Sequence, residues 1–272
     1  MLEQKYAALQ RSLLALGDVV IAFSGGVDST FLLKAAIDTL GRDKVLAVTA
    51  DSETYPREEL REARQLAAWL DAQHEVIATS ELGIAGYAEN TPDRCYFCKK
   101  NLFDNILPLM TARRYHNLAF GLIADDMGEH RPGTRAAREY RVRAPLQEVD
   151  LYKEEIRTLA QGLGLPNWDK PSFACLSSRV VYGEEITLAK LRRIDESERF
   201  IRSLGIRQVR VRTHGEMARI EVEPAAMSRL LECHEQILQR LRTLGYEWVA
   251  MDLGGYQSGS LNRILVREIQ SP

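Results

Sequence analysis

Apolar residues in the first half of the chain follow two alternating periods. Uninterrupted apolar runs are typical of strands buried on both faces, whereas apolar residues that recur at helical spacing are typical of helices packed on a sheet. The predicted strands are 19–23, 44–49, 75–78 and 117–121, and the predicted helices are 3–16, 29–37 and 58–70. This alternation predicts a parallel sheet with right-handed crossovers, which binds its ligands at the carboxyl ends of the strands.

The pattern continues to about residue 170 and then changes. We expect 131–133 to form a turn, 142–146 to close the sheet and 153–163 to form a helix that ends at Gly164. A loop rich in Pro and Ser follows at 171–179. Farther along, the pattern predicts helices at 188–204 and 227–244, an antiparallel hairpin of 208–212 with 218–222, and a strand at 248–253. The second part is therefore a smaller α+β domain, and we place the domains at 1–175 and 176–272.

Composition limits the classes of protein that fit this pattern. The chain has 272 residues, with 45% hydrophobic and 27% charged residues, as in ordinary globular proteins. A formal net charge of −2 gives no case for a nucleic-acid partner. The N-terminal residues lack the layout of a signal peptide, and no apolar run is long enough to cross a membrane. We therefore expect a cytoplasmic protein without a membrane partner.

The strand predicted at 19–23 ends in Ser-Gly-Gly-Val-Asp-Ser, residues 24–29, which we call the SGGVDS loop. Gly25 and Gly26 let the backbone approach an anion closely, and the helix that follows begins with unpaired N–H groups. The two serines add hydroxyl donors. Asp28 would repel a phosphate unless Mg²⁺ lay between them, which favours a metal-bound nucleotide over plain phosphate. A simple glycine turn is the alternative interpretation.

The SGGVDS loop resembles the SGGxDS motif of the PP-loop ATP pyrophosphatases, and it lacks the Gly-Lys-Ser/Thr ending of a Walker P-loop. Proteins of that superfamily typically cleave ATP between the α- and β-phosphates and activate an acceptor as its adenylate. The resemblance implies an α/β PP-loop fold (adenine nucleotide alpha hydrolase-like), with a doubly wound parallel sheet. It also implies that pyrophosphate and its Mg²⁺ are bound by Ser24, Gly25, Gly26, Asp28 and Ser29.

Two other strand ends carry candidate ATP-binding residues. Asp51 ends the second strand, beside the SGGVDS loop in a doubly wound sheet. Gly121 ends the fourth strand, and Asp125 and Asp126 follow it. This acidic pair resembles the one that follows a glycine in several PP-loop proteins, where it assists with ATP and its metal. An acidic surface turn is the alternative.

The cysteines predict a second chemistry. Cys95 and Cys98 form a C-x-x-C pair whose sulfurs can face one metal centre, and Cys175 can supply a third thiolate from a distant loop. Three thiolates fit a 4Fe-4S cluster with one open iron. Catalytic zinc and a metal-free dithiol, disulfide or persulfide pair remain as alternatives. Cys233 lies on an apolar helical stripe and is expected to be a buried thiol.

Further segments resemble one family of that superfamily, the LarE family, over nearly the whole chain. They are Asn90-Thr91-Pro92-Asp93, Arg131-Pro132-Gly133, Ala174-Cys175-Leu176-Ser177-Ser178-Arg179, Val209-Arg210-Val211-Arg212 and Asp252-Leu253-Gly254-Gly255. The family consists of ATP-dependent sulfur transferases that make the thiocarboxylates of the nickel-pincer nucleotide cofactor of lactate racemase. The resemblance implies that a pyridinium-3,5-biscarboxylic acid mononucleotide is adenylated and then attacked by sulfur.

The resemblance also assigns residues and partners. The chain is similar to the three-cysteine members, in which Cys95, Cys98 and Cys175 would ligate a 4Fe-4S cluster that carries a replaceable sulfide. The implied substrate region comprises Ser178, Arg179, Glu198, Arg210, Arg212 and Glu221. Guanidinium groups suit bidentate phosphate binding. The implied partners are a sulfide source, the other enzymes of nickel-pincer cofactor synthesis and further copies of the chain.

Two other functions fit the same motifs. A 4Fe-4S tRNA thiolase would share the ATP loop and the cysteines, although the chain has no series of C-x-x-C pairs and no strongly basic composition. A non-catalytic, metal-bound nucleotide sensor would use the ATP site as a switch.

Overall fold

The structure, a computed structural model, describes residues 2–127, 132–257 and 259–261. The described residues divide into two compact units, one from Met1–Ser80 with Cys95–Phe173 and the other from Glu81–Arg94 with Ala174–Pro272. The predicted domain division after residue 175 stays a prediction. Residues 81–94 group with the second unit because they bind its loop: the Tyr87 hydroxyl lies 2.7 Å from Ser177 Oγ, and Asn90 Nδ2 donates to the Val181 carbonyl at 2.6 Å.

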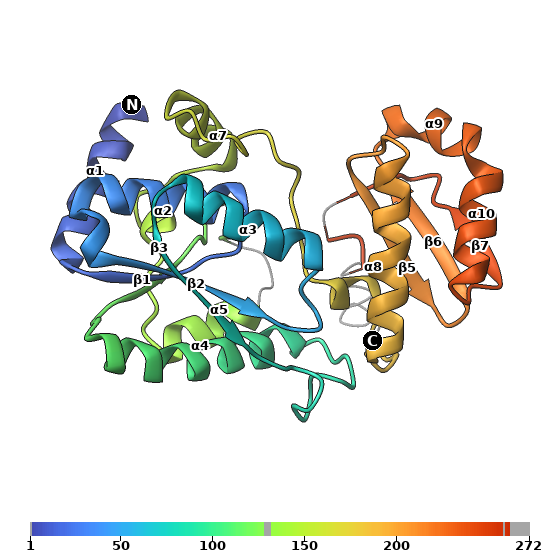
Figure 1. Ribbon diagram of the computed structural model, residues 1–272, viewed down its shortest axis with the longest axis horizontal. Helices are drawn as coiled ribbons and strands as arrows, with labels where there is room; N and C mark the ends of the chain where they lie inside the picture. Colours follow the sequence, from blue (N-terminus) through green and yellow to red (C-terminus); the bar gives the residue numbers. More distant parts are fainter. Residues whose placement is uncertain (1, 128–131, 258, 262–272) are drawn as a thin grey trace, which may run out of the picture. The chain divides into compact units, whose positions relative to one another are not determined.

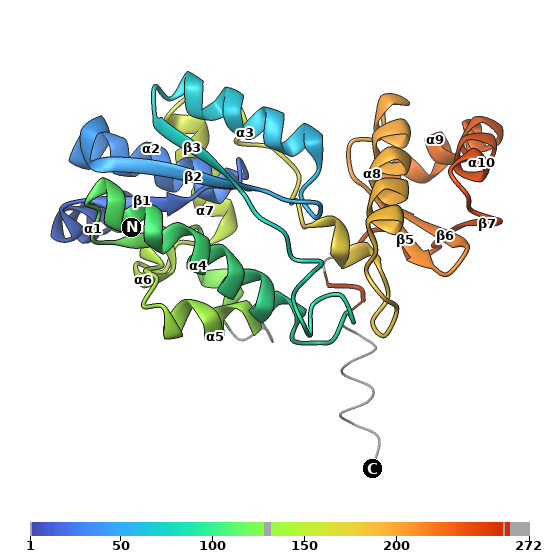
Figure 2. The same ribbon diagram turned by 60° about the horizontal axis from the view of Figure 1, so that its bottom comes forward.

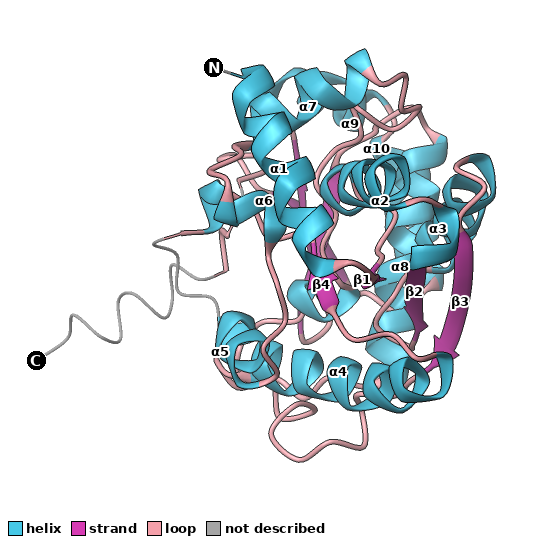
Figure 3. Cartoon of the chain, turned by 90° about the vertical axis from the view of Figure 1, so that its left-hand side faces the viewer, coloured by secondary structure: helices cyan, strands magenta, loops and turns pink. Residues whose placement is uncertain are grey.

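The first unit confirms the predicted parallel sheet. Among its described residues, β1 (Val19–Ala22), β2 (Val45–Asp51), β3 (Gln73–Ala78) and β4 (Leu118–Phe120) form a four-stranded parallel sheet in the order β3-β2-β1-β4. β1 pairs with both β2 and β4, so the loops that follow these three strands share one edge of the sheet. Figure 1 labels β1, β2 and β3, and Figure 3 labels all four strands.

Helices cover both faces of this sheet. They are α1 (Leu2–Leu16), α2 (Val27–Leu40), α3 (Arg57–Trp69), α4 (Arg94–Arg113), α5 (Pro132–Glu139), α6 (Pro145–Glu148) and α7 (Lys153–Gly162). The end-on view in Figure 3 shows α2 and α3 on one face and α4 and α5 on the other. Val19 and Ile21 belong to one apolar core and Val20 to the opposite one, which explains the unbroken apolar run in β1.

Two expectations for this unit are wrong, and one helix was not predicted. Residues 142–146 do not close the sheet as a strand: Arg143 forms one isolated bridge with Ala119, and Pro145, which has no N–H for a ladder, begins α6. The turn expected at 131–133 is instead the start of α5 at Pro132, while Arg131 lies outside the described residues. Helix α4 was not predicted from the sequence, because its apolar residues form no continuous stripe and Pro108 interrupts the pattern.

The second unit has the predicted α+β composition. It contains η3 (Leu176–Arg179), α8 (Leu188–Ser203), β5 (Val209–His214), β6 (Met217–Val222), η4 (Pro224–Ala226), α9 (Met227–Glu232), α10 (His234–Thr243) and β7 (Trp248–Met251). The hairpin β5-β6 is confirmed as antiparallel, and β7 pairs parallel to β6. The single helix expected at 227–244 is wrong: it breaks at Cys233, which leaves helical geometry but is buried as predicted.

One face of the small sheet packs on helices α8 and α10 (Figure 2). Val209 and Val211 of β5 point into this apolar core, so alternation sends Arg210 and Arg212 to the opposite face. No helix within the described ranges is long and apolar enough to span a bilayer.

Candidate active site

The SGGVDS loop connects β1 to α2. Gly25 has a φ of +65°, and a Cβ at this position would lie 3.0 Å from the Cα of Ala63 on α3, so only glycine fits without a shift. Ser29 Oγ lies 3.2 Å from Ser24 Oγ and donates to the Gly26 carbonyl at 3.2 Å. Gly26 is the N-cap of α2 and has no side chain to accept the first helical N–H groups. These groups favour an anion at this helix end.

The loop after β4 approaches the same helix end. A Cβ on Gly121 would lie 3.0 Å from the backbone nitrogen of Ser29, so glycine is required for this close approach. Asp126 accepts a hydrogen bond from the Ile123 N–H at 3.0 Å, and Asp125 accepts one from the Lys153 N–H at 2.8 Å. Asp51, at the end of β2, accepts from Arg57 Nη1 at 2.7 Å. Carboxylates therefore lie at the ends of the two strands that flank β1, the strand that leads into the SGGVDS loop.

Lys153 is a site residue that the sequence analysis missed. It is the first residue of α7, and its Nζ lies 2.6 Å and 2.5 Å from the two carboxylate oxygens of Asp28. Burial raises the pKa of Asp28, and the Lys153 ammonium opposes that rise. The missed signal was position: a lysine at a helix N-terminus opposes the helix dipole, so it needs a nearby anion.

Replacing Lys153 with methionine is expected to weaken ATP binding at neutral pH by about tenfold, or ~1.4 kcal/mol. The substitution removes a cation from the predicted phosphate site and allows the pKa of Asp28 to rise further. Asp28 would then be protonated at a higher pH, so the loss of ATP affinity should be larger at pH 6 than at pH 8. Titration of magnesium ATP by calorimetry at both pH values measures this effect.

Lys34→Met provides the matched control, because Lys34 lies on α2 and pairs with Asp38 on the helix surface. It should bind ATP as the unmodified protein does. Equal affinities for Lys153→Met and the unmodified protein at both pH values would contradict a role for Lys153.

In the second unit, Arg179 is fully buried and organises the loop that carries Cys175. Its Nε and Nη2 donate to the two carboxylate oxygens of Glu198 at 2.8 Å and 2.9 Å. Its Nη1 donates to the carbonyls of Ala174 and Cys175 and to Ser178 Oγ. Burial alone would raise the pKa of Glu198, but the positive charge of Arg179 prevails and lowers it to about 2. The pair is therefore ionised at neutral pH.

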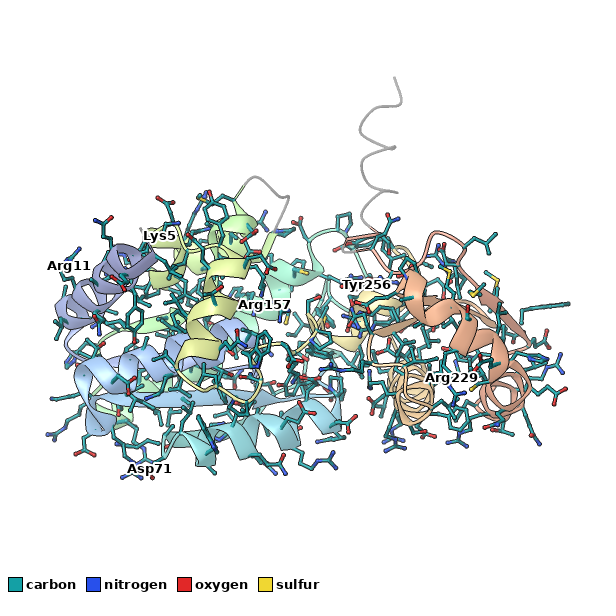
Figure 4. All side chains as sticks on the ribbon, turned by 90° about the horizontal axis from the view of Figure 1, so that it is seen from above. Lys5, Arg11, Asp71, Arg157, Arg229 and Tyr256 are labelled. Carbon is teal, nitrogen blue, oxygen red and sulfur yellow. The ribbon has the colours of Figure 1, made fainter. Side chains whose placement is uncertain are left out.

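A second buried pair lies on the strands. Arg212 donates through Nε and Nη2 to Glu221 at 3.0 Å and 2.8 Å, and through Nη1 to the Ser178 carbonyl at 2.8 Å. Arg210 is 5% exposed, and its guanidinium lies 5.1 Å from the ring centroid of Tyr256, which Figure 4 labels. Burial and the charge of Arg179 lower the pKa of Arg210. This concentration of cationic groups suits a phosphate.

The three candidate thiols are distributed over the two units. Cys95 and Cys98 lie in the first turn of α4, three residues apart and so on one side of the helix, while Cys175 precedes η3 in the second unit. Cys95 is exposed, and Cys98 and Cys175 are partly buried. Within the described part of the chain, no three His, Cys, Asp or Glu side chains are grouped closely enough to hold a metal ion.

The structure thus brings the predicted residues together as two sets. In the first unit, the predicted residues at the carboxyl edge of the sheet are Ser24, Gly25, Gly26, Asp28, Ser29, Asp51, Gly121, Asp125 and Asp126. In the second unit, Ser178, Arg179, Glu198, Arg212 and Glu221 share one hydrogen-bond network, with Arg210 on the same strand. Their roles stay predictions.

Comparisons with known proteins show what the chain is similar to. A family model described as NAD synthase matches residues 9–106, which include the SGGVDS loop. The chain is 43% identical over 269 residues to an uncharacterized protein of Synechocystis sp., covering 98% of this chain and 100% of the relative. It is 38% identical over 266 residues to the pyridinium-3,5-bisthiocarboxylic acid mononucleotide synthase of Lactiplantibacillus plantarum, covering 98% and 96%. An NH(3)-dependent NAD(+) synthetase of Chlorobaculum tepidum is 28% identical over 177 residues, covering 59% and 58%.

Proposed function

The chain belongs to the LarE family of the PP-loop superfamily, and from this premise we propose that it is an ATP-dependent sulfur transferase. Its substrate would be a pyridinium-3,5-biscarboxylic acid mononucleotide, whose two carboxylates become thiocarboxylates in nickel-pincer cofactor synthesis. Mononucleotide phosphate would bind beside Arg210 and Arg212, and ATP at the SGGVDS loop.

In the first step, a substrate carboxylate oxygen attacks the α-phosphorus of ATP. A bond forms between this oxygen and phosphorus, the bond to the bridging oxygen breaks, and pyrophosphate leaves. The N–H groups at the start of α2 and the serine hydroxyls would hold the pyrophosphate, and Asp28 would hold its Mg²⁺. Carboxylate oxygens are the ligands that this hard cation prefers. Lys153 would then move from Asp28 toward a phosphate oxygen.

In the second step, a sulfur nucleophile attacks the acyl carbon, the carbon–oxygen bond to AMP breaks, and AMP leaves with the electron pair. Adenylation is required because a free carboxylate is a poor electrophile. We propose Cys95, Cys98 and Cys175 as the residues that deliver the sulfur. The C-x-x-C spacing of Cys95 and Cys98 in α4 suits thiolate ligation, and Cys175 is the third candidate thiolate; zinc and a metal-free dithiol are the alternatives to a 4Fe-4S cluster. When bound, a 4Fe-4S cluster would supply one open iron for a sulfide ligand, which external sulfide can replace.

The observation that carries this proposal is a relative, 38% identical along nearly the whole chain, that is named for thiocarboxylate synthesis. The test incubates anaerobically purified protein with ATP, Mg²⁺, sulfide and the biscarboxylate mononucleotide. We expect a thiocarboxylate product by mass spectrometry together with pyrophosphate and AMP. Failure to form either product would refute the proposal. Thiolation of added tRNA would favour the thiolase alternative, and ATP binding without pyrophosphate release would favour the sensor.

A further inference from the structure

Two side chains hold the SGGVDS loop from its carbonyl side. The Tyr55 hydroxyl donates to the Ser24 carbonyl at 2.6 Å. Asn167 Nδ2 donates to the Gly25 carbonyl at 3.2 Å and is also 3.0 Å from Thr30 Oγ1. Burial and the charges of Glu59 and Glu62 raise the pKa of Tyr55, so its hydroxyl remains a donor.

These contacts determine where the loop's N–H groups point. A peptide unit is planar, so fixing the Ser24 carbonyl also fixes the Gly25 N–H on the opposite side, and fixing the Gly25 carbonyl fixes the Gly26 N–H. Both glycines belong to the proposed phosphate site, and glycine backbones are otherwise permissive. Tyr55 and Asn167 therefore restrict the directions in which the Gly25 and Gly26 N–H groups point.

Asn167 makes these contacts although its burial reduces the stability of the folded state. It is 8% exposed, and its Oδ1 is buried and accepts no hydrogen bond from the described residues. A buried polar atom without a partner destabilises the folded state. An apolar residue of similar size would avoid this penalty but could not hold the Gly25 carbonyl.

Asn167 begins the segment of chain that leads to Cys175, and Tyr55 contacts the other end of this segment. We call residues 167–173 the connecting segment. Arg157 of α7, labelled in Figure 4, donates to the carbonyls of Trp168 and Lys170 at 2.7 Å and 2.9 Å. Lys170 binds Glu59 and Glu62 of α3, each at 2.6 Å.

At its end, the connecting segment contacts Tyr55. The Phe173 ring packs edge-on against the Tyr55 ring, with centroids 5.9 Å apart. Phe173 precedes Cys175 by two residues. A shift of the SGGVDS loop that moves Tyr55 or Asn167 therefore also moves one end of the chain that bears the thiol.

We propose that Tyr55 and Asn167 are positioning residues that aim the Gly25 and Gly26 N–H groups at the nucleotide phosphates, and that they couple nucleotide binding to the environment of Cys175 through the connecting segment. This inference rests on the proposed binding of ATP at the SGGVDS loop.

The test measures alkylation of Cys175 by iodoacetamide in the reduced, metal-free full chain, using mass spectrometry of the peptide that contains it. The rate is compared without nucleotide and with saturating Mg²⁺ and α,β-methylene ATP, which resists cleavage at the α–β bond. In the unmodified protein, we expect the nucleotide to change the rate about fivefold or more, the low end of typical coupling between sites. A purely structural contact would not produce this dependence on nucleotide.

The variants Asn167→Ala and Tyr55→Phe should each bring the ratio of the two rates close to one and weaken nucleotide binding. Tyr55→Phe keeps the ring against Phe173 and loses only the hydroxyl, so it tests the coupling even if Asn167→Ala fails to fold. The controls are Asn105→Ala, whose amide donates to the Asn101 carbonyl within α4, and Tyr115→Phe, whose ring packs on the core beside α4, with buried Cys233 as the reference thiol. They should keep the ratio of the unmodified protein.

The outcomes separate this inference from the proposed function. If the unmodified protein binds no ATP, the proposed function fails. The proposed function stands if the unmodified protein binds ATP and releases pyrophosphate. The coupling is then wrong if the nucleotide leaves the rate of Cys175 alkylation unchanged. It is also wrong if Tyr55→Phe shows the same ratio of the two rates as the unmodified protein.

Discussion

Replacing Cys175 with alanine is expected to reduce thiocarboxylate formation below detection in the anaerobic assay. The substitution keeps the backbone contacts of residue 175, because its carbonyl accepts hydrogen bonds from Ser178 Oγ at 2.8 Å and from Arg179 Nη1 at 2.9 Å. The loop should therefore keep its conformation. The product is measured by mass spectrometry, and pyrophosphate is measured in the same samples to report adenylation separately.

Cys233→Ala is the matched control. Cys233 lies in the apolar core of the second unit, remote in sequence from the candidate residues of the cysteine loop, and its loss should affect stability more than product formation. Iron and zinc analysis of both variants tests the metal alternatives. If Cys175→Ala formed thiocarboxylate at the rate of Cys233→Ala, the assignment of Cys175 would have to be abandoned.

Replacing Arg179 with methionine is expected to destabilise the protein by about 3–5 kcal/mol, the usual cost of breaking a buried ion pair by removing one partner. Arg179 and Glu198 are both fully buried, so the variant leaves a carboxylate without its main counter-charge. The variant also removes the donor to the Ala174 and Cys175 carbonyls. Urea unfolding followed by circular dichroism measures the change in unfolding free energy.

The double variant Arg179→Met with Glu198→Leu should recover part of this loss, because it removes the uncompensated charge as well. A loss below about 1 kcal/mol for Arg179→Met would instead match an exposed pair and contradict this account.

The pair also gives stability a defined dependence on pH. The folded-state pKa of Glu198, about 2, is below its ordinary value of about 4.3, so the unfolded chain binds this proton more readily. The stabilisation is present above pH 4.3 and disappears as the pH falls toward 2. The double variant should lose this contribution to acid sensitivity.

The fold was largely predictable because its strands and helices carry strong periodic patterns. Strand β1 and the hairpin β5-β6 were recognisable from unbroken and alternating apolar residues, respectively. Helix α4 was not, because its apolar residues are spread around the helix. The break at Cys233 was not predictable either, since the apolar spacing continues across it and the change of direction depends on tertiary packing.

The candidate site was predictable where chemistry follows from a short motif. The SGGVDS loop and the paired arginines are local patterns. Lys153, Tyr55 and Asn167 reach the loop from 125, 31 and 142 residues away in sequence, respectively, so local spacing carries no sign of them. The full burial of Arg179 depends in the same way on Glu198, which is contributed by another helix.

The second unit is assembled from two separate stretches of chain, and this affects the order in which it can fold during synthesis. Tyr87 and Asn90 leave the ribosome well before their partners, since Tyr87 and Ser177 are 90 residues apart. The polar groups of residues 81–94 therefore stay solvated until η3 has been translated. A truncated polypeptide that began at α4 would lack the hydroxyl and amide that bind Ser177 and the carbonyls of Val180 and Val181.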